Sequence, residues 1–176
     1  YCLKKSLTPA KDRKPDDFHD VVGHEDLLPY LAAAVAGNNN LLLVGLSGCG
    51  KSLMAKLLPT ILPPMDDDEV LEVSSIYSIA DELDGHELKH TRPFRAPHYH
   101  MSSQALIGGG AYAKPGEVTL AHKGILFLDE LPEFSRKTLE SLRLPLEERW
   151  LTIRRVNQTN RYPADFMLVA AMNPCP

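Results

Sequence analysis

One octapeptide constrains the fold more than any other stretch of the chain, and it reads Gly45-Leu46-Ser47-Gly48-Cys49-Gly50-Lys51-Ser52. It follows a short apolar run, 41–44, and precedes residues 53–58, in which apolar side chains recur at helical spacing until Pro59. Glycines in such a loop let consecutive backbone N–H groups curl around phosphate oxygens at the start of a helix. The sequence therefore predicts a phosphate-binding loop between a strand and a helix.

Two side chains of this loop have predicted roles in binding ATP. The ammonium group of Lys51 is expected to reach the β- and γ-phosphates, and the hydroxyl of Ser52 is expected to ligate Mg²⁺. Cys49 is interpreted only as a small residue that fits the loop. The predicted nucleotide-binding residues of this segment are Gly45, Ser47, Gly48, Cys49, Gly50, Lys51, Ser52 and Leu53.

A second motif, residues 125–130, is a fully apolar run that ends in Asp129 and Glu130, as a central parallel strand would. Such a run alone is weak evidence, but downstream of a phosphate-binding loop it predicts that Asp129 holds the Mg²⁺ shell and Glu130 polarises the attacking water. Asn173 closes the next predicted strand, 166–172, and could hydrogen-bond the γ-phosphate or the water. The predicted catalytic set is Lys51, Asp129, Glu130 and Asn173.

The remaining pattern predicts alternating helices and strands, and therefore an α/β fold with a central parallel sheet whose carboxyl ends bind the ligand. A helix is expected from Glu25 to a stop at Gly37. The acidic residues 66–69 are interpreted as a solvated turn before a strand at 70–73, and 86–116 as a long irregular insertion of functional importance. A helix is expected at 135–148. A β-hairpin is expected from strands 150–156 and 160–163, with a polar tip at 157–159.

Composition fits one globular domain, since 44% of the 176 residues are hydrophobic and 24% are charged. No apolar run reaches the roughly 20 residues that span a bilayer, so we expect a cytoplasmic protein with no membrane partner. Three cysteines without a disulfide spacing are expected to be free thiols. The chain begins at Tyr1, which suggests a piece of a longer protein, with residues 1–17 as a linker and 18–176 as the domain.

The net charge of −4 gives no global signature of nucleic-acid binding, but the local charge is uneven. Between residues 89 and 123 five Lys and Arg side chains stand against one acid, Glu117, and between 149 and 161 four arginines stand against none. These segments could follow a phosphate backbone, or equally form a solvated face or a subunit contact. The candidate DNA-binding residues are Lys114, Arg154, Arg155 and Arg161.

The histidine-rich segment His98-Tyr99-His100, with His86 and His90 nearby, invites comparison with a metal site. It lacks the carboxylate or cysteine partners that complete such sites. Packing, or contact with a partner, is the favoured interpretation.

Five stretches together resemble the magnesium-chelatase-like AAA+ family, and most closely its ComM/YifB competence-protein branch. They are residues 20–24, the two nucleotide motifs, residues 92–98 and residues 170–176. The resemblance implies a P-loop AAA+ three-layer sandwich, with residues 108–119 as the helix-2 insert and 150–163 as the pre-sensor-1 hairpin. It also implies that Val22 and Gly23 line the adenine pocket and that Asn173 is sensor 1.

The resemblance further implies a homo-oligomer, as a hexameric ring, that migrates DNA branches during uptake of foreign DNA. The family's lid, sensor-2 arginine and arginine finger would lie beyond the end of this sequence. Three alternatives remain: a metal-chelatase ATPase subunit, a transcription-activating AAA+ ATPase, which residues 124–133 also resemble, and a nucleotide-gated scaffold without useful turnover. Gly108-Gly109-Gly110-Ala111 stands where the transcriptional activators carry a Gly-Ala-Phe-Thr-Gly-Ala loop.

Overall fold

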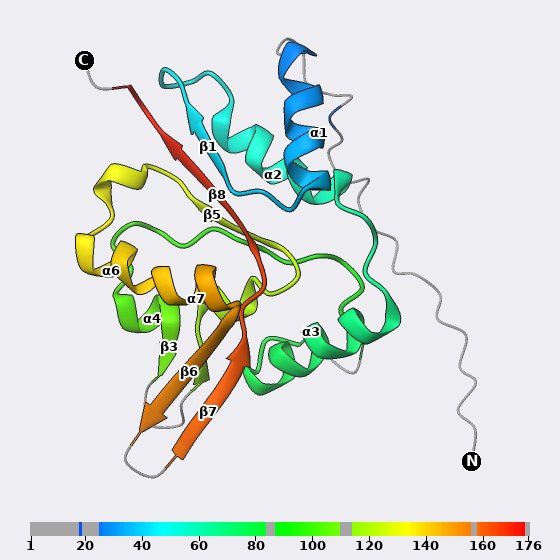
Figure 1. Cartoon of the computed structure of the whole chain (residues 1–176), viewed down its shortest axis with the longest axis vertical. Coiled ribbons are helices and arrows are strands. Elements are labelled where there is room, and N and C mark those ends of the chain that lie inside the picture. The colour runs from blue at the N-terminus through cyan, green and yellow to red at the C-terminus, as the bar shows by residue number, and fades with distance from the viewer. Residues whose placement is uncertain (1–17, 19–24, 84–86, 110–113, 156–157, 175–176) are drawn as a thin grey trace.

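The computed structural model describes Phe18 and residues 25–83, 87–109, 114–155 and 158–174, and its centre is a parallel four-stranded sheet (Figure 1). The strand order is β1-β8-β5-β2, so strands far apart in sequence lie side by side. The bounds are β1 (Leu41–Val44), β2 (Phe94–Arg95), β5 (Ile125–Leu128) and β8 (Met167–Met172). All three pairings are parallel, which confirms the predicted α/β class.

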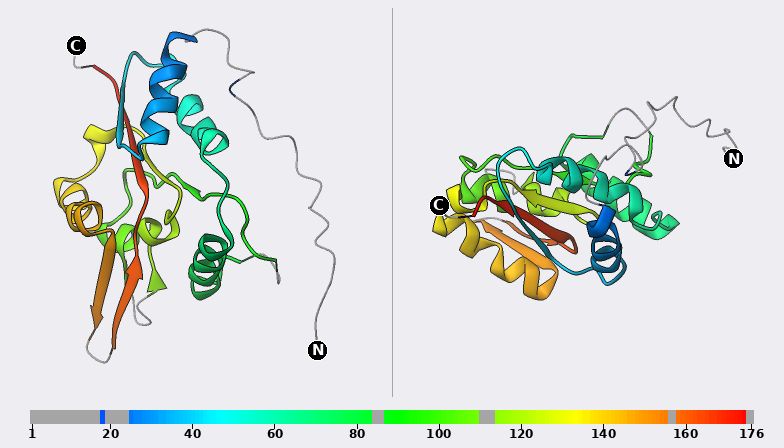
Figure 2. Two further views of the ribbon diagram at one scale, coloured as in Figure 1. Left: turned by 45° about the vertical axis from the view of Figure 1, so that its right-hand side comes forward. Right: turned by 90° about the horizontal axis from the view of Figure 1, so that it is seen from above.

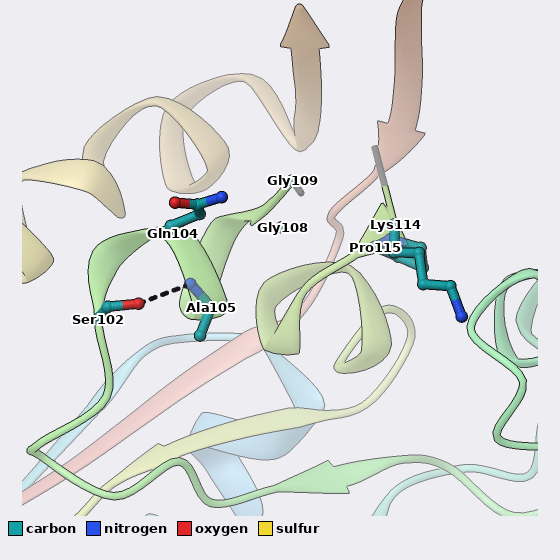
Figure 3. A pocket seen from close by; sticks show the side chains of 7 residues that line it. All are labelled: Ser102, Gln104, Ala105, Gly108, Gly109, Lys114 and Pro115. Atoms are coloured by element: carbon teal, nitrogen blue, oxygen red, sulfur yellow. Dashed lines mark hydrogen bonds between the residues drawn. The ribbon is translucent and has the colours of Figure 1, made fainter. Parts of the chain in front are cut away.

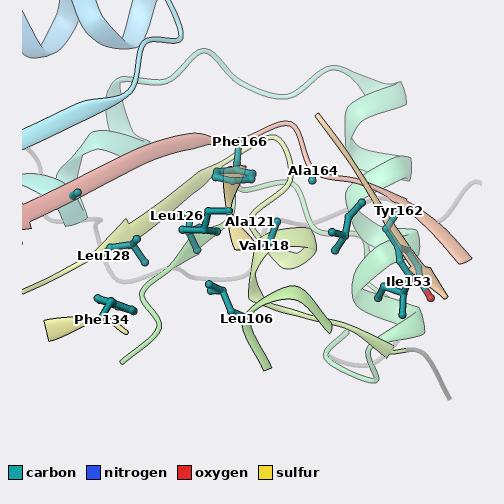
Figure 4. Close-up of a cluster of buried hydrophobic side chains, with 13 residues drawn as sticks. Leu106, Val118, Ala121, Leu126, Leu128, Phe134, Ile153, Tyr162, Ala164 and Phe166 are labelled. Atoms are coloured by element: carbon teal, nitrogen blue, oxygen red, sulfur yellow. The ribbon is translucent and has the colours of Figure 1, made fainter. Parts of the chain in front are cut away.

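Helices cover both faces of the sheet, so the fold has three layers with the sheet in the middle (Figure 2). They are η2 (Glu25–Leu27), α1 (Leu28–Ala36), α2 (Lys51–Ile61), α3 (Asp67–Ile79), α4 (Ser103–Ile107), α5 (Glu117–Leu120), η3 (Leu131–Glu133), α6 (Arg136–Ser141) and α7 (Arg143–Glu148). Because side chains alternate along a strand, Ile125 and Phe127 of β5 pack with α1 and α2. Leu126 and Leu128 pack on the opposite face, in a cluster that includes Leu106 of α4 (Figure 4).

The strand predicted at residues 70–73 is wrong, because this segment lies inside helix α3. Asp66 accepts a hydrogen bond from the Glu69 backbone N–H at 2.8 Å, and the Glu69 side chain accepts one from the Asp66 N–H, which completes a capping box. The acidic residues predicted as a turn therefore form the helix start, where negative charge is favourable. Val70, Val73 and Tyr77 are buried at helical spacing.

Two further differences from the predicted helices lie at prolines. The expected single helix 135–148 is two helices, α6 and α7, which meet at Leu142. Pro145 has no N–H to donate to the carbonyl of Ser141, so a continuous helical ladder cannot pass this point. Helix α2, by contrast, continues past Pro59 to Ile61, beyond its predicted end.

Two antiparallel hairpins lie away from the main sheet. The predicted hairpin is confirmed as β6 (Trp150–Arg155) and β7 (Gln158–Pro163), which is longer on its second strand than expected. The insert contains β3 (Gly108–Gly109) and β4 (Lys114–Pro115). A methyl group on Gly108 would lie 2.6 Å from the Lys114 carbonyl oxygen and 2.9 Å from Ile153 Cδ1. The insert and the longer hairpin therefore pack closely at a position that requires glycine.

No helix in the described part of the chain is long and apolar enough to cross a membrane.

Candidate nucleotide-binding site

The predicted phosphate-binding loop joins β1 to α2 at the carboxyl edge of the sheet. Gly48 and Gly50 have φ values of 81° and 85°, in the left-handed region that favours glycine. Gly50 is also the N-cap of α2, so the loop runs directly into the helix start. At its beginning the Gly45 N–H donates to the Met172 carbonyl oxygen at 3.3 Å, which fixes the loop to β8.

The Lys51 ammonium group lies at the centre of this loop. Its Nζ donates to the carbonyl oxygens of Gly45 at 2.7 Å and Leu46 at 2.9 Å, and to Asn173 Oδ1 at 3.0 Å. Asn173 follows β8, so two predicted catalytic residues 122 positions apart are in contact. The positive charge is held where the loop and the helix start would present N–H groups to a phosphate.

The two predicted Mg²⁺ ligands also meet. Ser52 Oγ donates a hydrogen bond to Asp129 Oδ2 at 2.6 Å, which joins the first turn of α2 to the end of β5. One hydroxyl and one carboxylate oxygen at a single point suit Mg²⁺, because this ion takes few protein ligands and completes its octahedron with waters and phosphate oxygens. The donor set therefore fits a magnesium ion that accompanies a nucleotide.

Glu130 sits just beyond the carboxyl end of β5. Its backbone is left-handed, with φ 53°, and its N–H donates to Asp129 Oδ1 at 3.0 Å. Because of this tight turn, the carboxylates of Asp129 and Glu130 point in different directions. Asp129 binds Ser52. The Glu130 side chain is exposed and has no partner among the described residues. An exposed carboxylate beside the predicted metal ligand is free to accept a proton from water.

The other predicted nucleotide-binding residues divide into three groups. Cys49 is a free thiol whose Sγ lies 3.8 Å from Lys51 Nζ, so it borders the same space. Ser47 and Leu53 are exposed on the loop and on the first turn of α2. Val22 and Gly23, predicted for the adenine pocket, lie outside the described residues.

The sequence matches the protein family described as magnesium chelatase, subunit ChlI, over residues 17–176. The chain belongs to the magnesium chelatase family. Competence protein ComM of Haemophilus influenzae is 46% identical over 175 residues, and YifB of Salmonella typhimurium is 47% identical over 160 residues. These alignments cover 99% and 91% of this chain, and they support the ComM/YifB branch. The chain spans about one third of these relatives, 34% and 32% of their lengths.

Solved structures of AAA+ proteins share the fold. The complex between subunits BchI and BchD of magnesium chelatase aligns with a TM-score of 0.68 and 21% identity, over 89% of this chain and 54% of that chain. NtrX from Brucella abortus in complex with ADP aligns with a TM-score of 0.59 and 21% identity, over 88% and 31%. At this identity the likeness establishes the AAA+ P-loop fold predicted from the sequence.

The uneven local charge of this family member is largely neutralised in three dimensions. Arg95 binds both carboxylate oxygens of Glu117, Nε to Oε2 at 2.6 Å and Nη2 to Oε1 at 2.7 Å, and Nη1 also donates to Glu82 at 2.8 Å. Hydrogen bonding to Glu117 raises the pKa of Arg95 further above its ordinary value. Arg92 contacts Glu69 at 3.0 Å. Glu69 and Glu82, which lie outside residues 89–123, therefore compensate charge that the count along the sequence leaves unpaired.

Asp165, just before β8, binds two more of these cations. Lys123 Nζ donates to it at 3.1 Å, and Arg149 Nη1 donates to its other oxygen. Burial raises the pKa of Asp165, but the hydrogen bonds from Lys123 and Arg149 outweigh burial and hold that pKa below its ordinary value. Arg149 immediately precedes the hairpin and Asp165 follows it, so this contact joins the two ends of the hairpin. Arg149 is thus not part of an unpaired basic run.

His122 is a buried polar residue that no sequence motif singles out. Its Nδ1 accepts from the Asp165 N–H at 3.1 Å, and its Nε2 lies 3.1 Å from Glu72 Oε2 of α3. Burial lowers the pKa of His122 against the opposing influence of Glu72, so the imidazole is neutral at neutral pH.

The candidate DNA-binding residues have different surroundings. Lys114 contacts Asp81 at 2.5 Å, so its charge is compensated. The guanidinium carbon of Arg161 lies 4.5 Å from the centre of the Trp150 ring. Arg154 and Arg155 pair with Thr159 and Gln158 in the hairpin, and their side chains lie outside the described residues. Among the arginines of the two basic segments whose side chains the structure describes, Arg161 is the one without an acidic partner, so it remains a DNA candidate.

A cluster of aromatic rings and an open hollow lie near the insert. The rings of His98, Tyr99 and His100 pack on one another, with centroids 4.3–5.2 Å apart, which agrees with the favoured packing interpretation. No group of three metal-ligating side chains occurs in the described part of the chain. Beside them, an open hollow of about 340 Å³ lies between α4 and the β3–β4 hairpin, bordered by Ser102, Gln104 and Lys114 (Figure 3).

Proposed function

We propose that the chain is the nucleotide-binding core of a Mg-ATP-hydrolysing AAA+ motor that remodels DNA as a homo-oligomeric ring. The observation that carries the ATP part is the meeting of Lys51, Ser52, Asp129 and Asn173 at the carboxyl edge of three parallel strands. In open α/β sheets this edge is where ligands bind. The convergence of four polar side chains from three distant segments at this edge is the arrangement expected of a shared ligand site.

The proposed division of labour follows from the contacts. Lys51 pairs with the phosphates, and Ser52 with Asp129 would hold Mg²⁺, which neutralises charge on the transferred phosphoryl group when bound. Glu130 orients the attacking water and accepts its proton, because it is the exposed carboxylate of the pair. Asn173, already bonded to Lys51, reports the state of the γ-phosphate position to β8.

The ring and the DNA substrate are supported by the relatives. One relative is named a competence protein, and the BchI–BchD structure is an assembly of related subunits. A hexamer is the oligomer that the family resemblance favours. Arg161 of the β6–β7 hairpin, which has no acidic partner in the described part of the structure, gives DNA a candidate contact in this chain. We propose residues 18–176 as the AAA+ core and residues 1–17 as its linker.

The experiment that tests the proposal measures ATP turnover of the full-length protein with and without branched DNA. We expect magnesium-dependent turnover that rises when a four-way junction is added. The control is the Glu130→Gln variant, in which the amide keeps the size of the side chain but cannot accept the proton. An ATP turnover rate that stays the same when DNA is added would refute the DNA motor and favour a chelatase-type ATPase. Absence of turnover at saturating Mg-ATP would favour the scaffold.

A further inference from the structure

The outward face of the β6–β7 hairpin carries side chains that the ATP site does not use. On the inner face Leu151, Ile153 and Tyr162 are 5%, 5% and 7% exposed and belong to the core cluster in Figure 4. Residues directly opposite in an antiparallel pair share a face, and successive residues alternate. The pairs Trp150–Pro163 and Thr152–Arg161 therefore lie on the outer face.

Trp150 and Arg161 form one combined surface on this face. The guanidinium carbon of Arg161 lies over the Trp150 ring, 4.5 Å from its centre, at a distance typical of a cation–π contact. Even with this cover the indole remains 39% exposed, and Arg161 is exposed as well. A planar aromatic ring and a planar cation are thus presented together to solvent.

The charge of the hairpin sets it apart from the rest of the chain. Residues 150–163 contain three arginines and no acid, in a chain of net charge −4. Arg92, Arg95 and Arg149 are each bound to carboxylates, whereas Arg161 has no acidic partner in the described part of the structure. Positive charge that remains available to a partner therefore lies beside the exposed indole.

We propose that this outer face is a stacking site for single-stranded nucleic acid. An unpaired base would stack on Trp150, and Arg161 would contact a neighbouring phosphate. Aromatic rings combined with cations are the usual means of binding single strands without sequence preference. In a duplex the bases already stack on each other, so the indole would have no free base to receive. An acidic peptide would use Arg161 and leave the ring unused. The inference rests on the proposed DNA function and specifies its substrate and contact face.

The fluorescence of Trp150 tests the inference directly, because it is the only tryptophan in the 176 residues. An oligothymidylate of about 20 nucleotides, longer than the site of a typical single-strand-binding domain, is titrated into the chain. We expect quenching of the indole emission as bases stack. A blunt duplex of the same length should quench it much less at equal concentration.

Variants at both positions separate stacking from charge, with affinity measured by the anisotropy of the fluorescein-labelled oligonucleotide. Trp150→Ala should weaken binding about 5- to 150-fold, the loss of one stacked base, while Trp150→Phe retains most of the affinity. Arg161→Ala should lower the salt slope by about 0.7, whereas Arg161→Lys keeps the slope. Lys56→Ala, an exposed cation on α2, is the matched control and should change neither.

Three results would overturn the inference. The first is Trp150→Ala binding the oligonucleotide like the wild type. The second is a change of oligomeric mass in Trp150→Ala, by light scattering, with unchanged affinity, which identifies a subunit contact. The third is a wild-type chain that binds Mg-ATP but no oligonucleotide, which refutes the stacking site and leaves the proposed function to the four-way-junction test. Mg-ATP affinity and melting temperature of each variant show whether it is folded.

Discussion

Replacing Arg95 with alanine should destabilise the fold, although the sequence places Arg95 in a basic segment that could follow DNA or equally form a solvated face or a subunit contact. The guanidinium binds Glu117 through two hydrogen bonds of 2.6 and 2.7 Å, and it reaches Glu82 at 2.8 Å. Glu117 begins α5, and Arg95 ends β2, so the pair joins the edge strand of the sheet to the helix that precedes β5.

The magnitude follows from burial. Breaking a fully buried pair costs about 3–5 kcal/mol, because the remaining charge is left without a partner. An exposed pair contributes about 0–1 kcal/mol. The side chains of Arg95 and Glu117 are 22% and 17% exposed, nearer to the buried limit, so we expect a loss of about 2–3 kcal/mol. In a chain of this size that lowers the melting temperature by about 5–10 °C.

The assay is thermal unfolding followed by circular dichroism. Arg143→Ala is the control, because Arg143 makes exposed ion pairs with Glu147 and Glu140, and we expect it to melt like the wild type. Adding Glu117→Gln to Arg95→Ala should recover part of the loss, since it removes the unpaired charge. An Arg95→Ala variant that melts with the wild type would refute the argument that this ion pair stabilises the fold.

Three further outcomes are expected. Glu130→Gln in the full-length protein should keep Mg-ATP affinity and lose at least about 100-fold in turnover, and unchanged turnover would place the base elsewhere. The free energy of unfolding should fall as pH drops below about 6.5, because burial lowers the pKa of His122 and the unfolded chain then binds the additional proton. His122→Gln should flatten that part of the denaturation profile, and an identical profile would contradict the assignment. Gly108→Ala should cost more than about 1 kcal/mol in urea unfolding, since φ is 103° and the methyl would meet the Lys114 carbonyl; wild-type stability would contradict this.

The parts of the molecule that the sequence predicts correctly are those fixed by local chemistry. The strands 41–44 and 125–128 are continuous apolar runs, and both runs form strands of the sheet. Central strand β5 is buried on both faces, whereas in edge strand β1 Leu42 and Val44 are exposed. Gly48 and Gly50 adopt the left-handed angles of a phosphate-binding loop. The contacts of Lys51 with Asn173 and of Ser52 with Asp129 follow from the rule that parallel strands end at one edge.

Two kinds of feature could not be predicted: segments in which a strand and a helix compete, and contacts between residues far apart in the sequence. The run 70–73 suits a strand or a helix, and the capping box of Asp66 with Glu69 decides for the helix. The carboxylates that neutralise the basic segments come from α3, from the turn after it and from Asp165, two residues before β8. A count of charge along the sequence cannot include partners brought together only by the fold.

Nucleotide binding by the Lys51→Ala variant tests the central claim most directly. Titration calorimetry of the chain with ATP and Mg²⁺ should show binding by the wild type and by Lys56→Ala, whose exposed ammonium lies further along the same helix. Lys51→Ala should bind about 10- to 100-fold more weakly, the equivalent of one hydrogen bond to a charged group. Equal affinity in Lys51→Ala and the wild type would contradict the assignment of this loop as the phosphate site.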